Sequence, residues 1–167
     1  GADEFKWRMG RYSAYELNAE QIERLAQESF VSEYGGESRL NRNLVGRNAS
    51  VLGARLGLQL EDSLRLLIGE TGADHIFVRE EQMMPFLPIV RVANVDQGIR
   101  EAVISEHGYG HTAIIHSRNI ENMHKMACAM DTVIFVKKGP SYAGTGLGGD
   151  VFGADLKRGP PGQGCPA

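Results

Sequence analysis

Residues 132–149 read TVIFVKKGPSYAGTGLGG, and this stretch indicates the fold class. Its first five residues, Thr132 to Val136, are mostly β-branched and apolar, which predicts a short buried strand. After Lys137 a glycine-rich loop begins, and glycine permits backbone conformations that other residues resist. A buried strand that runs into such a loop is how an α/β enzyme usually forms a ligand crevice. The stretch therefore predicts an α/β fold with a crevice near these glycines.

Three earlier apolar runs predict further strands, at residues 64–69, 88–92 and 112–116. A helical pattern begins at Asn94 and ends near Gly108, and Asn119 precedes another that runs to Met130. Strands separated by single helices imply right-handed crossovers and a mostly parallel sheet. Because the runs are apolar nearly throughout, we expect both faces of that sheet to be covered.

A helical lead-in precedes the strands. Residues 3–9 are amphipathic, and Asn18 with Gln21 three residues later is typical of a helix N-terminus. Apolar residues then recur on one helical face, and they are Ile22, Leu25, Ala26 and Phe30. After a polar turn at residues 34–42, Asn48 is expected to begin a second helix that ends at Gly57.

The composition narrows the class of protein. The 167 residues are 42% apolar and 23% charged, which is typical of a soluble globular domain with a real core. The net charge of −3 and the lack of long basic or apolar runs favour neither a nucleic-acid nor a membrane partner. The polar start of the chain indicates no secretory signal, and two cysteines fit a reducing compartment without a disulfide framework.

Three groups of residues are candidates for chemistry. His111 lies where a glycine-broken loop meets a strand, and a histidine there can transfer protons or simply cap the loop by hydrogen bonds. Glu81 is, by itself, a charged residue of a surface loop. Residues 144–149 have the pattern GxGxGG, a weak phosphate-binding signal because no helix follows.

The cysteines and histidines suggest no further site. Cys128 is expected to pack in a helix as a small apolar residue, and Cys165 lies in a Gly/Pro-rich tail without a scaffold. The five histidines have neither a paired-cysteine nor an HExxH pattern, so we expect no metal.

Several segments together resemble the CoA-acylating aldehyde dehydrogenases, the propionaldehyde and acetaldehyde dehydrogenases linked to bacterial microcompartments. Residues 135–144, FVKKGPSYAG, are similar to the FVKNGPSYAG segment of that family. The other matching segments are NLVG at 43–46, EQMMP at 81–85, LPIVRV at 87–92 and HTA at 111–113. The resemblance extends from about Phe5 to Gly149. It implies that residues 1–149 are the C-terminal part of an aldehyde dehydrogenase catalytic domain and that 150–167 form a divergent Gly/Pro-rich tail.

The resemblance implies oxidation of a short aldehyde to acyl-CoA with NAD and coenzyme A. Glu81 would hold the nicotinamide ribose hydroxyls, with Met83 beside it where the wider superfamily has phenylalanine. His111 would act near the acyl carbon, and Gly144 and Gly146 would shape the acyl or CoA pocket. The family also implies a homo-oligomer in the bacterial cytoplasm or the microcompartment lumen.

The family's nucleophilic cysteine and NAD domain would lie before the segment matched by residues 3–9. We therefore expect the 167 residues alone to be inactive. Two other readings remain open, a non-catalytic remnant and a CoA- or nucleotide-binding module. The tail departs from the family where a neighbouring subunit would pair, so altered oligomerisation and exposed apolar surface are expected.

Overall fold

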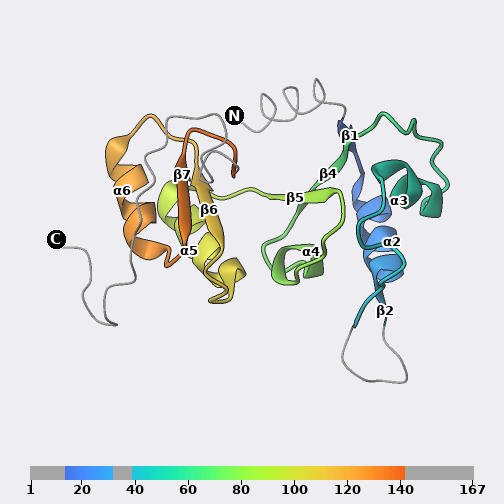
Figure 1. Ribbon diagram of the computed structural model, residues 1–167, viewed down its shortest axis with the longest axis horizontal. Coiled ribbons are helices and arrows are strands. Elements are labelled where there is room, and N and C mark those ends of the chain that lie inside the picture. Colours follow the sequence, from blue (N-terminus) through green and yellow to red (C-terminus); the bar gives the residue numbers. More distant parts are fainter. Residues whose placement is uncertain (1–13, 32–38, 142–167) are drawn as a thin grey trace. The chain divides into compact units, whose positions relative to one another are not determined.

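The computed structural model describes residues 14–31 and 39–141 (Figure 1). These residues belong to two compact units, Gly1–Arg91 and Val92–Ala167. The first unit contains β1 (Ala14–Glu16), α2 (Ala19–Ser29), β2 (Phe30–Val31), β3 (Arg39–Leu40), α3 (Ala49–Arg55), β4 (Leu66–Thr71), α4 (Ile76–Arg79) and β5 (Phe86–Val90). The second contains α5 (Val95–Glu106), β6 (Thr112–Ile115), α6 (Ile120–Ala129) and β7 (Ile134–Lys137).

The main sheet of the first unit has the strand order β1-β4-β5, and both of its strand pairs are parallel. Leu67 of the central strand lies opposite Tyr15 on one side and Phe86 on the other. A separate antiparallel pair joins β2 to β3. The parallel pairs need crossover connections: the one from β1 to β4 contains α2, β2, β3 and α3, and the one from β4 to β5 contains α4.

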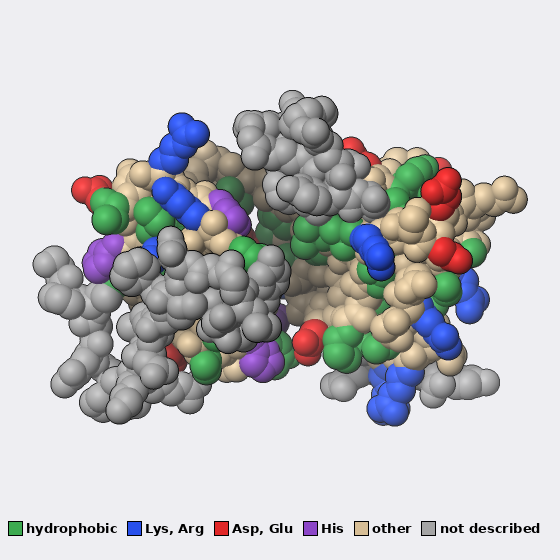
Figure 2. Space-filling model, turned by 45° about the horizontal axis from the view of Figure 1, so that its top comes forward, with side chains coloured by type: hydrophobic (Ala, Val, Ile, Leu, Met, Phe, Trp, Pro, Cys, Tyr) green, Lys and Arg blue, Asp and Glu red, His purple; other side chains and the backbone are tan. Residues whose placement is uncertain are grey.

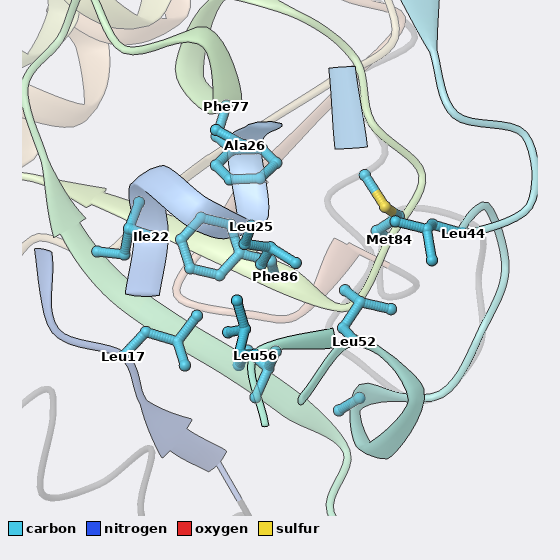
Figure 3. Close-up of a cluster of buried hydrophobic side chains, with 12 residues drawn as sticks. Leu17, Ile22, Leu25, Ala26, Leu44, Leu52, Leu56, Phe77, Met84 and Phe86 are labelled. Carbon is cyan, nitrogen blue, oxygen red and sulfur yellow. The ribbon is translucent and has the colours of Figure 1, made fainter. Parts of the chain in front are cut away.

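Helix α2 covers this sheet with an apolar face. Its N-terminus is closed by a capping box, in which Asn18 Oδ1 accepts from Gln21 N and Gln21 Oε1 accepts from Asn18 N, both at 2.9 Å. Ile22 and Leu25 are buried on the face that this cap orients. Figure 3 shows them in one cluster with side chains from α3, α4, β5 and the loops between. Burial of each such leucine or isoleucine contributes about 1.5–3 kcal/mol.

A glycine lets α2 approach the central strand closely. A Cβ added at Gly69 of β4 would lie 2.5 Å from Ile22 Cδ1. A Cβ does not fit at that distance, so the Ile22 side chain of α2 packs directly on the strand backbone at this point.

The second unit is built around the parallel pair β6–β7, in which Ala113 lies opposite Phe135. Asn94 and Asn119 cap α5 and α6 by accepting from backbone N–H groups. The two helices pack against each other, and Lys125 Nζ lies 3.1 Å from Asp96 Oδ1 between them. Along β6 exposed and buried residues alternate, so the side chains on one face of this strand are exposed.

The predicted α/β class with mostly parallel strands is confirmed. The described strands form two parallel sheets and a small antiparallel pair. An apolar run identifies a strand without identifying its neighbour in the sheet, so these pairings come from the structure alone. The expectation that both faces are covered holds for the centre of β4 and fails for β6.

Element boundaries also differ from the predictions. The strand expected at 88–92 is shifted to Phe86–Val90, and the loop expected before Glu81 contains α4. Phe30 ends α2 in extended conformation and begins β2 instead of continuing the helical face. The amphipathic residues 3–9 and the tail at 150–167 lie outside the described residues, so the predicted boundary at 149 stays a prediction.

Candidate functional site

Glu81 lies in the short loop that joins α4 to β5. The backbone of this loop is held at several points: Met83 O accepts from Gly46 N at 3.1 Å, and Pro85 O accepts from Leu67 N at 2.8 Å. The first contact joins two segments on which the family resemblance rests, residues 43–46 and 81–85. Glu81 is therefore carried by a loop tied to both the sheet and the chain before α3.

Two consecutive methionines of this loop have opposite roles. Met84 is buried in the core cluster, where Figure 3 shows it beside Leu44. Met83 has a left-handed backbone with φ of 50° and a side chain that is 61% exposed. A non-glycine residue rarely adopts this conformation, and such residues concentrate at ligand sites. The buried Met84 anchors the loop, while Met83 and Glu81 remain accessible.

The side chain of Glu81 has no hydrogen-bond or ion-pair partner among the described residues. Its neighbour Gln82 is turned inward, and Gln82 Nε2 donates to Phe86 O at 3.2 Å. An exposed carboxylate on an anchored loop can accept two hydrogen bonds from a diol, which is the chemistry expected at a ribose. The geometry of the described residues fits this role.

His111 lies in the second unit, immediately before β6. Its backbone carbonyl accepts from Ile134 N at 3.1 Å, and the carbonyl of Gly110 accepts from Val133 N at 2.9 Å. The imidazole is exposed and stacks on Tyr109, with ring centroids 6.0 Å apart and planes at 18°. The backbone of His111 is thus fixed by the start of β7 while its side chain remains available for proton transfer.

The position of His111 differs from that of the glycine-rich loop. His111 precedes β6, whereas the segment toward Gly144 leaves the carboxyl end of β7, and the two strands are parallel. His111 therefore lies at the amino ends of these strands, and the glycine-rich segment begins at their carboxyl ends. Gly144 and Gly146 lie outside the described residues.

Helix α6 does not bury Cys128, so the prediction that this cysteine packs as a small apolar residue is wrong. None of the residues of α6 is buried, and Cys128 Sγ lies 3.6 Å from His124 Nε2 on its exposed side. Figure 2 shows histidine side chains on the surface of the second unit, mixed with side chains of either charge. Within residues 14–31 and 39–141, no group of three or more His, Cys, Asp or Glu side chains could hold a metal ion. Cys165 lies outside those ranges.

The sequence reading missed Glu106, whose carboxylate accepts from three backbone N–H groups in the turn before His111. A signal was present: an acidic residue just before HGYGH, at the end of a helix, where the helix dipole disfavours negative charge.

No protein-family model matches the chain. Among curated proteins, the acetaldehyde dehydrogenase (acetylating) EutE of Salmonella typhimurium is 46% identical over 164 residues. The match covers 98% of this chain and 35% of that enzyme. The chain is thus similar to one part of the acetylating acetaldehyde dehydrogenases. It spans about a third of the length of the curated relatives it matches.

Solved structures of two propionaldehyde dehydrogenases and a glycolyl-CoA reductase each contain a part with the same fold. The propionaldehyde dehydrogenase of Rhodopseudomonas palustris with bound propionyl-CoA has a TM-score of 0.80 and 37% identity, covering 98% of this chain and 35% of that one. An enzyme from the fucose utilisation microcompartment of Clostridium phytofermentans has the same TM-score and identity, covering 89% and 33%. An engineered glycolyl-CoA reductase with bound NADP+ also has a TM-score of 0.80 and 37% identity, covering 98% and 36%.

The described residues contain no helix that is both long and apolar enough to cross a membrane.

Proposed function

We propose that the chain is part of the catalytic domain of a CoA-acylating aldehyde dehydrogenase, which oxidises a short aldehyde to acyl-CoA with NAD and coenzyme A. The observation that carries the proposal is the 46% identity to an acetylating acetaldehyde dehydrogenase over 98% of the chain. In this reaction NAD accepts a hydride and the CoA thiol receives the acyl group. The structures with bound NADP+ and propionyl-CoA support these two cofactor classes.

The candidate residues have three separate tasks in this proposal. Glu81, with Met83 beside it, binds the ribose hydroxyls of the nicotinamide nucleotide, since its carboxylate is exposed and unpaired among the described residues. His111 transfers a proton near the acyl carbon, since its imidazole is exposed on a fixed backbone. Gly144 and Gly146 shape the acyl or CoA pocket. Cys128 is not the nucleophile in this proposal, because it lies far from the N-terminus of α6 and its sulfur is disulfide-bonded in the structure.

The proposed oligomeric state and cellular location are also based on these relatives. We propose a homo-oligomer in the bacterial cytoplasm or a microcompartment lumen, without nucleic-acid partners. One solved relative comes from a microcompartment, which supports the second location.

The test uses a chimera in which this chain replaces the matching third of the Salmonella enzyme. Purified chimera is assayed for NADH formation with propionaldehyde or acetaldehyde, CoA and NAD. We expect His111→Ala to lower kcat by about 100-fold, because general acid–base groups contribute that much or more. The matched control is His116→Ala, an exposed histidine at the other end of the same strand, which is expected to leave kcat unchanged.

If His111→Ala leaves kcat within about twofold of the unmutated chimera, His111 has no part in the chemistry. The 167-residue chain assayed alone is expected to form no NADH. CoA-dependent NADH formation by the chain alone would direct attention back to Cys128.

A further inference from the structure

The turn between α5 and β6 is closed by the side chain of Glu106. Its Oε2 accepts from Gly108 N at 2.9 Å, and its Oε1 accepts from His111 N at 3.3 Å and from Gly110 N in a shorter contact. Its backbone carbonyl accepts from Tyr109 N at 3.1 Å. Three backbone N–H groups thus converge on one carboxylate, which fills the position of an anion in a cradle of amides.

The negative charge of Glu106 is unfavourable for helix α5 itself. It is the last residue of α5, whose last turn has no basic residue, and negative charge at a helix C-terminus opposes the helix dipole. The turn also requires left-handed backbones, with φ of 55° at His107, 79° at Gly108 and 69° at Gly110. Such local costs are expected where the chain needs one particular geometry.

The turn fixes the position of the His111 backbone. Glu106 holds the N–H of His111, and β7 holds its carbonyl through Ile134 N at 3.1 Å. Gly110, just before it, is buried and is held in the same two ways. The imidazole therefore projects from a backbone that is fixed on both sides.

We propose that Glu106 is a positioning residue for His111. The carboxylate sets the backbone of residues 108–111 and so directs the imidazole toward the reacting acyl group. The inference rests on the proposed function, in which His111 is the group that acts on the substrate.

Glu106→Gln in the chimera is the first variant. The amide keeps the size of the side chain but replaces one acceptor oxygen by a donor, which then faces a backbone N–H. We expect kcat to fall by about 10- to 100-fold because the imidazole is misplaced. KM for aldehyde, CoA and NAD is expected to stay within about threefold. Glu121→Gln, which removes an exposed carboxylate from α6 in the same unit, is the charge-loss control.

A double-mutant cycle separates positioning from general damage. If Glu106 acts through His111, Glu106→Gln changes kcat by less than about twofold once His111 is alanine. Equal losses in both backgrounds would overturn the proposal. An inactive unmutated chimera, or full activity of His111→Ala, would instead contradict the proposed function and remove the positioning role with it.

Amide hydrogen exchange of the 167-residue chain tests the turn without any activity. We expect Glu106→Gln to speed exchange at Gly110 and His111 by about 10-fold or more while Ala113 in β6 is unchanged. Unchanged exchange at the turn, or equal acceleration along β6, would show that Glu106 does not hold the His111 backbone.

Discussion

At the scale of single residues, the candidate side chains share one arrangement. Glu81 and His111 are both exposed, yet the backbone around each is tied down by hydrogen bonds from a distant segment. Gly46 holds the loop that carries Glu81, and β7 holds the strand end that carries His111. Such an arrangement leaves the polar groups free for a ligand while limiting their movement, which is what binding and catalysis require.

Glu81→Gln tests the ribose-binding role in the chimera. The variant keeps one acceptor oxygen and replaces the other by a donor, so the bidentate interaction with a diol is lost. We expect KM for NAD to rise by about 10-fold, with kcat much less affected, in steady-state NADH assays.

The matched control for this prediction is Glu80→Gln. Glu80 is the neighbouring exposed carboxylate, and its backbone N–H, which donates to Ile76 O at 2.8 Å, is untouched by the substitution. An equal rise in KM for NAD in both variants would mean that only the local negative charge matters.

Some of the candidate site residues could be predicted from the sequence, and one could not. Glu81, Met83 and His111 were accessible to sequence reading because they lie in recognisable motifs. Glu106 was not found, because its role depends on amides brought together by three left-handed residues. The sequence displays the acidic residue and the two glycines after it, but it does not show that the backbone amides converge on the carboxylate.

At the scale of elements, helix caps decide where the helices begin. Asn18 forms both bonds of a capping box, whereas Asn48 begins α3 without a side-chain hydrogen bond. The two asparagines therefore provide a matched pair for measuring the value of a cap.

Asn18→Ala is expected to lower the free energy of unfolding by about 1 kcal/mol, because Gln21 N loses its acceptor. Asn48→Ala is expected to cost less than about 0.5 kcal/mol, since no cap bond is lost. Urea titrations of the 167-residue chain followed by circular dichroism measure both values. Equal costs would show that the capping box contributes nothing beyond the backbone preference of asparagine.

Two glycines inside elements are expected to respond to alanine in opposite directions. At Gly69 the new Cβ would meet Ile22 Cδ1 at 2.5 Å, and overpacking of this kind costs about 1–3 kcal/mol. At Gly98 in α5 the nearest atom is Val92 Cγ2 at 3.4 Å, so the better helix propensity of alanine stabilises by about 0.5–1 kcal/mol. Thermal unfolding of both variants tests this pair, and destabilisation by Gly98→Ala would show that α5 is packed more tightly there.

Elements with a strong local signal were predicted best. The capped helices α2, α5 and α6 and strands β4, β6 and β7 were predicted within a few residues. The short elements β1, β2, β3 and α4 were not expected, because stretches of two to four residues carry little periodicity. Pairing into two parallel sheets depends on contacts between distant segments, so the order of the runs alone did not determine it.

At the scale of the whole molecule, the chain matches about a third of the length of an acetylating acetaldehyde dehydrogenase. The match covers 98% of this chain and 35% of the acetaldehyde dehydrogenase, so the proposed roles of the candidate residues are best tested with the rest of that relative present. The fold of the described residues agrees with this, because solved relatives with 37% identity superpose with TM-scores of 0.80.

The measurement that most directly tests the central claim is CoA-dependent NADH formation by the unmutated chimera. The account predicts turnover of a short aldehyde within about 10-fold of the parent Salmonella enzyme, and no NADH when CoA is omitted. A chimera that folds, binds NAD and CoA, and still forms no NADH would contradict the claim. That result would favour a non-catalytic remnant that retains the fold of the family.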